Sequence, residues 1–247
     1  MRFSPLPKVV KLLLALFLVL AIFAPLPYSI VLPGRAQNIF DKIITVKNQD
    51  SYPATGRLDL MSIRVTNPNT WIVGPEILYS WVRADEAVYP KAAIYPPGTT
   101  AESEAKQAKA DMVNSQDNAI STALTYLRLH PEFGLTAEQL HIKNIGFDVK
   151  KTGGPSGGMV FAIGVIELLT KEDLLRGRHV AGTGTISTDG KVGAIGGINE
   201  KIMAAYKSGA TLFLAPAENE SEIAHTPDGI KVVAVSTLDQ AIQALRR

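Results

Sequence analysis

The stretch from residue 153 to residue 169, GGPSGGMVFAIGVIELL, places a glycine-rich turn directly before a strongly apolar segment of helical length. Glycine and proline interrupt regular structure in the turn, and the apolar run is bounded by it on one side. We expect a helix over residues 156–169 that begins at Ser156. A helix this apolar belongs in the interior of a folded domain.

Outward from this helix, strand and helix patterns alternate along the chain. The expected strands are residues 43–46, 57–65, 141–149, 180–186, 211–214 and 231–235, and the other expected helices are 101–129, as one helix or two, 198–208 and 238–245. A turn is expected at Asp189-Gly190, and residues 84–100 suggest no chemistry. This alternation predicts an α/β (α+β) domain with a mixed sheet and packed helices.

The N-terminal segment has the composition of a membrane anchor. Three basic residues precede an apolar run from Leu12 to Leu32, with no acidic residue before Asp41. The run is about as long as the ~20 residues that cross a hydrocarbon core, although Pro25 and Pro27 weaken its outer end. We expect residues 1–34 to form a cytoplasmic stub and one transmembrane helix, which tethers an extracytoplasmic domain to the cell membrane. A cleaved signal peptide and secretion are the alternative.

The remaining chain divides into a linker with a first strand, residues 35–56, and a folded domain, residues 57–247. A formal net charge of +2 with 19% charged residues provides no broad basic surface, so nucleic acid is not an expected partner. With no cysteine, the chain has neither a thiol nucleophile nor a disulfide framework. The four histidines show no metal-ligand spacing, so surface positions are expected for them and no metal or cofactor is expected.

Ser156 is the first candidate for chemistry. Gly154 and Gly157 flank it and would let a substrate approach closely, and the free N–H groups of a first helical turn can stabilise an oxyanion. The alternative is that Ser156 only caps the helix.

A serine hydroxyl needs a base to remove its proton, and Lys201 is the candidate. In the expected helix 198–208, Lys201 lies on the shoulder of the apolar stripe, with Glu200 and Lys207 near the opposite side. Partial burial would lower the pKa of the Lys201 amine and leave some of it neutral. The alternative is a lysine whose stem lies along the core edge with its head in water.

Several motifs together resemble those of Lon proteases. Residues 154–158, Gly-Pro-Ser-Gly-Gly, are similar to the segment around the family's nucleophile. The blocks 182–186, 190–192 and 195–201, GTGTI, GKV and IGGINEK, resemble the sequence that leads to its catalytic lysine. The motifs of residues 204–219 agree in order and spacing, and the resemblance covers about residues 110–245.

The resemblance implies a Lon-type proteolytic domain in which Ser156 is the nucleophile, Lys201 the general base and Thr183 a hydroxyl near the lysine, with Gly154 and Gly157 in support. It implies a peptide or protein substrate, with a homo-oligomer as an option. Gly153 and Gly157 replace residues that are common in the family, and in this respect the sequence resembles the family's membrane-anchored branch. That branch usually carries a PDZ module, but the strand expected at residues 141–149 follows the long helix too closely to leave room for one.

An ATPase module normally accompanies a Lon protease, but no phosphate-binding loop is recognisable. The segment most similar to such a loop runs from Gly184 to Val192. Its glycine spacing is one residue too long, and Val192 replaces the Ser or Thr that holds magnesium. We therefore expect no ATP dependence within this chain.

Two other functions stay open. Residues 154–158 also fit the G-x-S-x-G turn of α/β-hydrolases, which would make the chain an esterase with Ser156, Asp189 and His225 as its triad. The second is a non-catalytic, membrane-bound binding module that has kept the fold.

Overall fold

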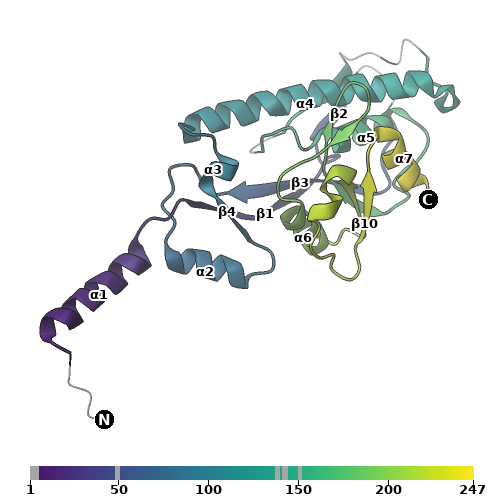
Figure 1. The fold of residues 1–247 in the computed structure, drawn as a ribbon. Helices are drawn as coiled ribbons and strands as arrows, with labels where there is room; N and C mark the ends of the chain where they lie inside the picture. Colours follow the sequence, from purple (N-terminus) through teal and green to yellow (C-terminus); the bar gives the residue numbers. More distant parts are fainter. Residues whose placement is uncertain (1–5, 48–50, 137–139, 141–143, 150–151) are drawn as a thin grey trace. The chain divides into compact units, whose positions relative to one another are not determined.

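The computed structural model describes residues 6–47, 51–136, 140, 144–149 and 152–247. These fall into two compact units, each described by itself. The first unit combines Met1–Leu32 with Val65–Ala101, and the second combines Pro33–Arg64 with Glu102–Arg247. Figure 1 labels the elements of both units along the chain.

The second unit is built on a sheet with the strand order β10-β9-β6-β3-β1. Its strands are β1 (Tyr28–Asn38, from Pro33 onward), β3 (Arg57–Val65), β6 (His179–Gly182), β9 (Leu212–Pro216) and β10 (Lys231–Val235). The pairs β3·β6, β6·β9 and β9·β10 are parallel. Parallel strands are commonly buried on both faces, and the central strand β9 (LFLAP) is apolar and buried throughout.

Helices cover both faces of this sheet. They are α4 (Ala101–Leu129), α5 (Gly158–Leu169), α6 (Ile198–Ser208) and α7 (Leu238–Arg246). Val180 and Leu214 pack into the larger core with α4, α5 and α7. Ala181 and Phe213, the neighbours of these residues in sequence, pack into a second core with α6. Because successive strand residues point to opposite faces, α6 lies on the opposite face from the other three helices.

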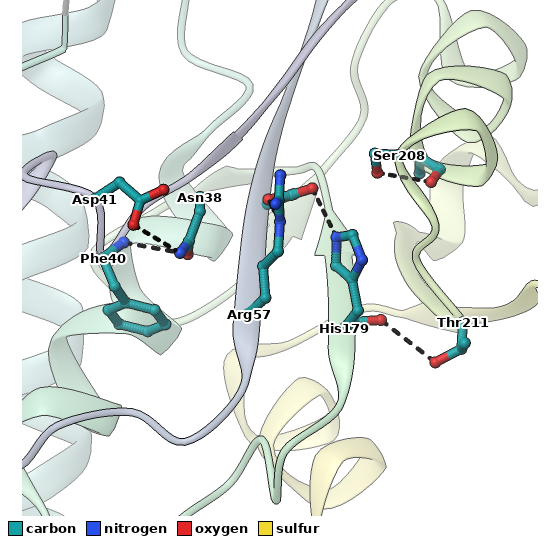
Figure 2. A network of polar contacts seen from close by, with 9 residues as sticks. Asn38, Phe40, Asp41, Arg57, His179, Ser208 and Thr211 are labelled. Atoms are coloured by element: carbon teal, nitrogen blue, oxygen red, sulfur yellow. Dashed lines mark hydrogen bonds and ion pairs between the residues drawn. The ribbon is translucent and has the colours of Figure 1, made fainter.

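A polar network centred on the buried Asp59 carboxylate ties β3 to β6. The Asp59 carboxylate is fully buried; it accepts a hydrogen bond from Arg57 Nε at 2.7 Å and lies 2.8 Å from His179 Nε2. Figure 2 shows Arg57 and His179 on adjacent strands, with the His179 carbonyl directed at Thr211. His179 was expected at the surface; instead its side chain is 19% exposed, because its ring contacts the buried Asp59 carboxylate.

Shorter elements complete this unit. The strands β2 (Ile44–Val46) and β5 (Ile145–Phe147) pair with each other, as do β7 (Thr185–Ile186) and β8 (Val192–Gly193). The segments η1 (Pro131–Phe133) and η4 (Ala217–Glu222) are 3-10 helices. The expected strand 180–186 is thus two strands, interrupted where Gly184 adopts a φ of +158°. Of the expected strand 141–149, residues 145–147 form β5, and residues 141–143 lie outside the described residues.

The first unit has a small core of its own. It contains α1 (Lys8–Phe23), α2 (Gly74–Val82), β4 (Ala87–Pro90), α3 (Lys91–Ile94) and the start of β1, whose residues Tyr28–Val31 pair antiparallel with β4. Ile30, Ile72 and Ile77 form its buried centre. None of α2, β4 and α3 was expected from the sequence.

The expected span from Leu12 to Leu32 is not one helix. α1 ends at Phe23, and β1 starts at Tyr28. Pro25 and Pro27 explain the break, because proline lacks the backbone donor and restricts the residue before it to extended conformations. Within the described part of the chain, no helix combines the length and the apolar character needed to cross a membrane.

Candidate active site

Ser156 lies in the loop before α5, held there by α4. The helix starts at Gly158, two residues later than expected, and Ser156 is half-buried. Two hydrogen bonds fix the loop: Gly154 N–H donates to the Ala108 carbonyl at 2.7 Å, and Ser115 Oγ donates to the Pro155 carbonyl at 2.9 Å. The loop that carries the serine is therefore anchored on both sides of Pro155.

Gly154 and Gly157, on either side of Pro155-Ser156, are required by the structure for different reasons. Gly154 has a φ of +87°, a conformation that other residues adopt at a cost. A Cβ on Gly157 would lie 2.7 Å from Leu60 Cδ1, so that glycine packs against the core. Gly157 thus lets the loop approach β3.

Backbone donors for an oxyanion are present at Ser156, in the loop just before α5. The N–H groups of Gly158 and Met159, in the first turn of α5, already donate to the carbonyls of Pro155 and Gly184. For the N–H groups of Ser156 and Gly157, the described residues provide no hydrogen-bond acceptor. These two are the donors that a developing negative oxygen next to Ser156 could use.

Lys201 is buried in the first turn of α6, with only 2% of its surface exposed. Burial disfavours a charged amine and lowers the pKa of Lys201 to about 7, while the adjacent Glu200 carboxylate acts in the opposite direction. The alternative of a lysine with its head in water is therefore wrong. At neutral pH a large fraction of this amine is uncharged and can accept a proton.

Thr183 connects the lysine to the serine loop. Lys201 Nζ donates to Thr183 Oγ1 at 3.1 Å, and the Thr183 hydroxyl donates to the Ser156 carbonyl, also at 3.1 Å. Gly184 N–H donates to the same carbonyl at 2.8 Å. The hydrogen bonds among the described residues include none between Ser156 Oγ and Lys201 Nζ, so Thr183 holds the amine in this state.

Ser156 and Lys201 line the same cavity, which has a volume of about 500 Å³. Its walls come from residues 152–157, residues 60–64 of β3, Arg35 and Gln37 of β1, Met112 of α4, and Gly196. Ser156 also borders a second cavity, of about 320 Å³, lined by Ala194, Asn219 and Glu222 among others. The serine therefore stands where two cavities meet.

Glu200, next to Lys201 in α6, is not where it was expected. It was expected opposite the apolar stripe of its helix, yet it is 4% exposed, and its Oε2 has no hydrogen-bond partner in the described part of the chain. Burial raises the pKa of this carboxyl. Both β9 and η4 contact α6 and so cover two of its sides, which a helical projection of α6 alone could not reveal.

The residues of the esterase alternative do not come together. Asp189 and His225 are absent from the walls of both cavities that Ser156 borders. Asp189 is exposed in a turn, where it interacts with Ser187 and Lys191, and His225 is exposed in a loop. The structure thus disfavours this triad.

Of the two remaining histidines, His130 is not among the residues that line the two cavities at Ser156. His130 stacks on Tyr126 with 3.9 Å between ring centroids, and His141 lies outside the described residues. No group of three or more His, Asp or Glu side chains suited to a metal ion occurs among the residues that the structure describes.

The fold and these cavities define an α/β domain with a loop serine and a buried, weakly basic lysine on one cavity wall. The chain belongs to the Lon protease (S16) C-terminal proteolytic domain family, whose sequence model matches residues 105–246, more than half of the chain.

Curated relatives agree with this assignment. The chain is 33% identical over 133 residues to the Lon protease of Clostridioides difficile, a match covering 49% of this chain and 16% of that protein. It is 34% identical over 129 residues to Lon protease 2 of Herpetosiphon aurantiacus, covering 49% and 16%. It is 24% identical over 207 residues to the Lon protease of Azospirillum brasilense, covering 81% and 25%. The chain thus matches no more than a quarter of the length of these relatives.

Proposed function

We propose that this chain is a membrane-tethered serine endopeptidase that cleaves peptide bonds with Ser156 and Lys201, without ATP. The observation that carries the proposal is the buried Lys201 amine, with a pKa of about 7, on the wall of the cavity that Ser156 lines. Membership of the Lon family supports proteolysis as the reaction.

In the proposed mechanism, neutral Lys201 removes the Ser156 proton as the serine oxygen attacks a peptide carbonyl. Thr183 accepts a hydrogen bond from one Lys201 N–H and donates a hydrogen bond from its own hydroxyl to the Ser156 carbonyl. The lone pair of the Lys201 nitrogen is therefore free to accept the serine proton. A rotation of the Ser156 side chain toward the amine brings the two groups together, since catalytic hydrogen bonds commonly tighten only once substrate is bound.

The negative oxygen that forms would accept hydrogen bonds from the N–H groups of Ser156 and Gly157, worth roughly 3 kcal/mol each in comparable sites. Protonated Lys201 then gives its proton to the departing amine. Water releases the acyl group from Ser156 by the reverse sequence of proton transfers.

The arrangement of the cavities favours cleavage within a chain over removal of a terminal residue. Ser156 borders both cavities, so substrate residues on the two sides of the scissile bond can each find a space. We infer that α1, an apolar helix with no buried residue and with Lys8 and Lys11 near its start, tethers the chain to the cell membrane. The proteolytic domain would lie on the extracytoplasmic side.

Incubation of the purified chain with an unfolded model protein tests the proposal. We expect internal cleavage, identified by mass spectrometry of the products, at a rate that Mg-ATP does not change. A cleavage rate that Mg-ATP raises severalfold would contradict ATP independence. A complete lack of cleavage would favour a non-catalytic binding module.

The Glu200→Gln variant should shift the acidic limb of the pH profile of kcat/KM to lower pH. The ionised Glu200 carboxylate raises the pKa of Lys201, so removing its charge lets the amine lose its proton at lower pH. A shift of a few tenths to about one pH unit is expected, where one unit corresponds to about 1.4 kcal/mol.

The exposed Glu220 offers the matched control, because Glu220→Gln removes a nearby charge outside the cavity walls. Its pH profile should coincide with that of the unmodified protein. An acidic limb that stays in place or moves upward in Glu200→Gln would disprove this electrostatic coupling.

A further inference from the structure

The first unit carries an apolar surface that its own core does not cover. Five large side chains of α2 and the preceding segment are exposed: Trp71 at 75%, Leu78 at 61%, Tyr79 at 62%, Trp81 at 66% and Val82 at 86%. We call these residues the α2 patch. A surface helix of a globular protein normally presents polar residues on the side away from the core, so this composition requires an explanation.

Three residues of the α2 patch form one stripe along the helix. Leu78, Trp81 and Val82 follow the i, i+3, i+4 spacing of one helix face. Ile77 and Ser80, also three residues apart, are buried on the inner side. α2 is therefore held by one face and exposes a second, uncharged face.

The charged groups near α2 are already paired. Glu76 Oε2 accepts a hydrogen bond from Val73 N–H at the start of the helix, at 2.9 Å. Arg83 forms ion pairs with Asp85 at 3.2 Å and Glu86 at 3.0 Å. In a low-dielectric environment against the patch, the Arg83 charge would therefore still be paired.

The chemistry of the surroundings points to lipid rather than to a protein partner. α1 belongs to the same unit, and its last turn meets the start of α2: a Cβ on Gly74 would lie 3.6 Å from the Ala21 carbonyl oxygen. From residue 12 to residue 23, α1 is apolar all round and has no buried residue. A folded partner covers one side of a helix, whereas acyl chains surround it.

We propose that the α2 patch is a second membrane contact, lying at the headgroup level of the bilayer beside the emerging end of α1. Tryptophan and tyrosine favour this level because their rings are apolar with one polar tip. α2 then lies in the plane of the membrane as an interfacial helix. This inference rests on the membrane tether of the proposed function, but not on its chemistry.

The chain contains two tryptophans, Trp71 and Trp81, and both belong to the patch, so their fluorescence reports on it without a label. The full chain is reconstituted in vesicles of phosphatidylcholine and phosphatidylglycerol that contain lipids brominated either near the headgroup or deep in the acyl chain. We expect strong quenching by the shallow bromine, weaker quenching by the deep bromine, and protection from aqueous iodide.

Variants separate the two rings and the two membrane contacts. Trp71→Phe and Trp81→Phe should each retain quenching by the shallow bromine. Leu78→Glu combined with Val82→Glu should reduce that quenching severalfold, while flotation of the vesicles still carries the protein through α1.

Three results would overturn the inference. In the first, the protein floats with the vesicles while iodide, and not bromine, quenches its emission. In the second, a concentration-dependent blue shift without bromine quenching shows that a second copy of the chain covers the patch. In the third, the protein does not float at all. Peptide cleavage measured on the same vesicles reports on the catalytic proposal separately.

Discussion

Replacing Lys201 with methionine should lower kcat/KM for peptide cleavage by about three to six orders of magnitude and leave the domain folded. Methionine has a similar length but cannot accept a proton, so Ser156 loses its base. Lys207→Met is the matched control, because Lys207 is an exposed lysine of the same helix. Its activity should stay within about twofold of the unmodified protein, because Lys207 is not among the residues that line the two cavities at Ser156.

The buried Lys201 amine should also make the free energy of unfolding depend on pH. Burial lowers the Lys201 pKa from 10.5 to about 7, so between these values the unfolded chain binds a proton that the folded chain does not. Stability must therefore rise with pH across this window, by several kcal/mol at about 1.4 kcal/mol per pKa unit.

Urea unfolding from pH 6.5 to pH 10 measures this effect as the difference between the unmodified protein and Lys201→Met. The variant should lack the rise, and near pH 7 it should be at least as stable as the unmodified protein. Residual activity within tenfold of the unmodified protein, or parallel stability curves, would contradict the role of Lys201.

Replacing Ser156 with alanine should reduce cleavage to the same low level, because the hydroxyl is the attacking group. The two residues are proposed to act as a unit, so the double variant Ser156→Ala with Lys201→Met should be no less active than either single variant. Ser208→Ala, at the end of α6, is the control and should keep its activity. Additive losses in the double variant would indicate that the two residues act independently.

Much of the fold could be predicted from the sequence, because its elements have strong local patterns. The strands at residues 57–65 and 231–235 and the helices at 101–129 and 198–208 have the expected bounds. These segments combine apolar periodicity with clear glycine, proline or polar boundaries.

The missed features depend on contacts distant in the sequence. α2 exposes apolar residues, so its pattern does not show which side faces a core. Glu200 is buried because η4 and β9 close around α6, and no local signal predicts that closure. The loop at Ser156 is fixed by two residues of α4 that lie far from it in the sequence. Ala108 accepts a hydrogen bond from Gly154 N–H, and Ser115, 40 residues before Pro155, donates one to the Pro155 carbonyl.

For the candidate site, the sequence supplied the residues but not their arrangement. The local residue patterns indicated Ser156 and Lys201 as candidates, and the family resemblance supported both and added Thr183. The structure adds that Thr183 lies between the other two, accepting a hydrogen bond from the amine and donating one to the serine carbonyl.

The pH dependence of the reaction between Ser156 and a serine-reactive phosphonate tests the pairing of these two groups most directly. The bond forms only at an activated hydroxyl, and mass spectrometry identifies the modified residue. We predict that Ser156 is the residue modified and that the rate rises with pH to a plateau, with its midpoint near pH 7, where Lys201 loses its proton. A rate that keeps rising to the ordinary lysine pKa of about 10.4, or modification of a different serine, would contradict the Ser156–Lys201 mechanism.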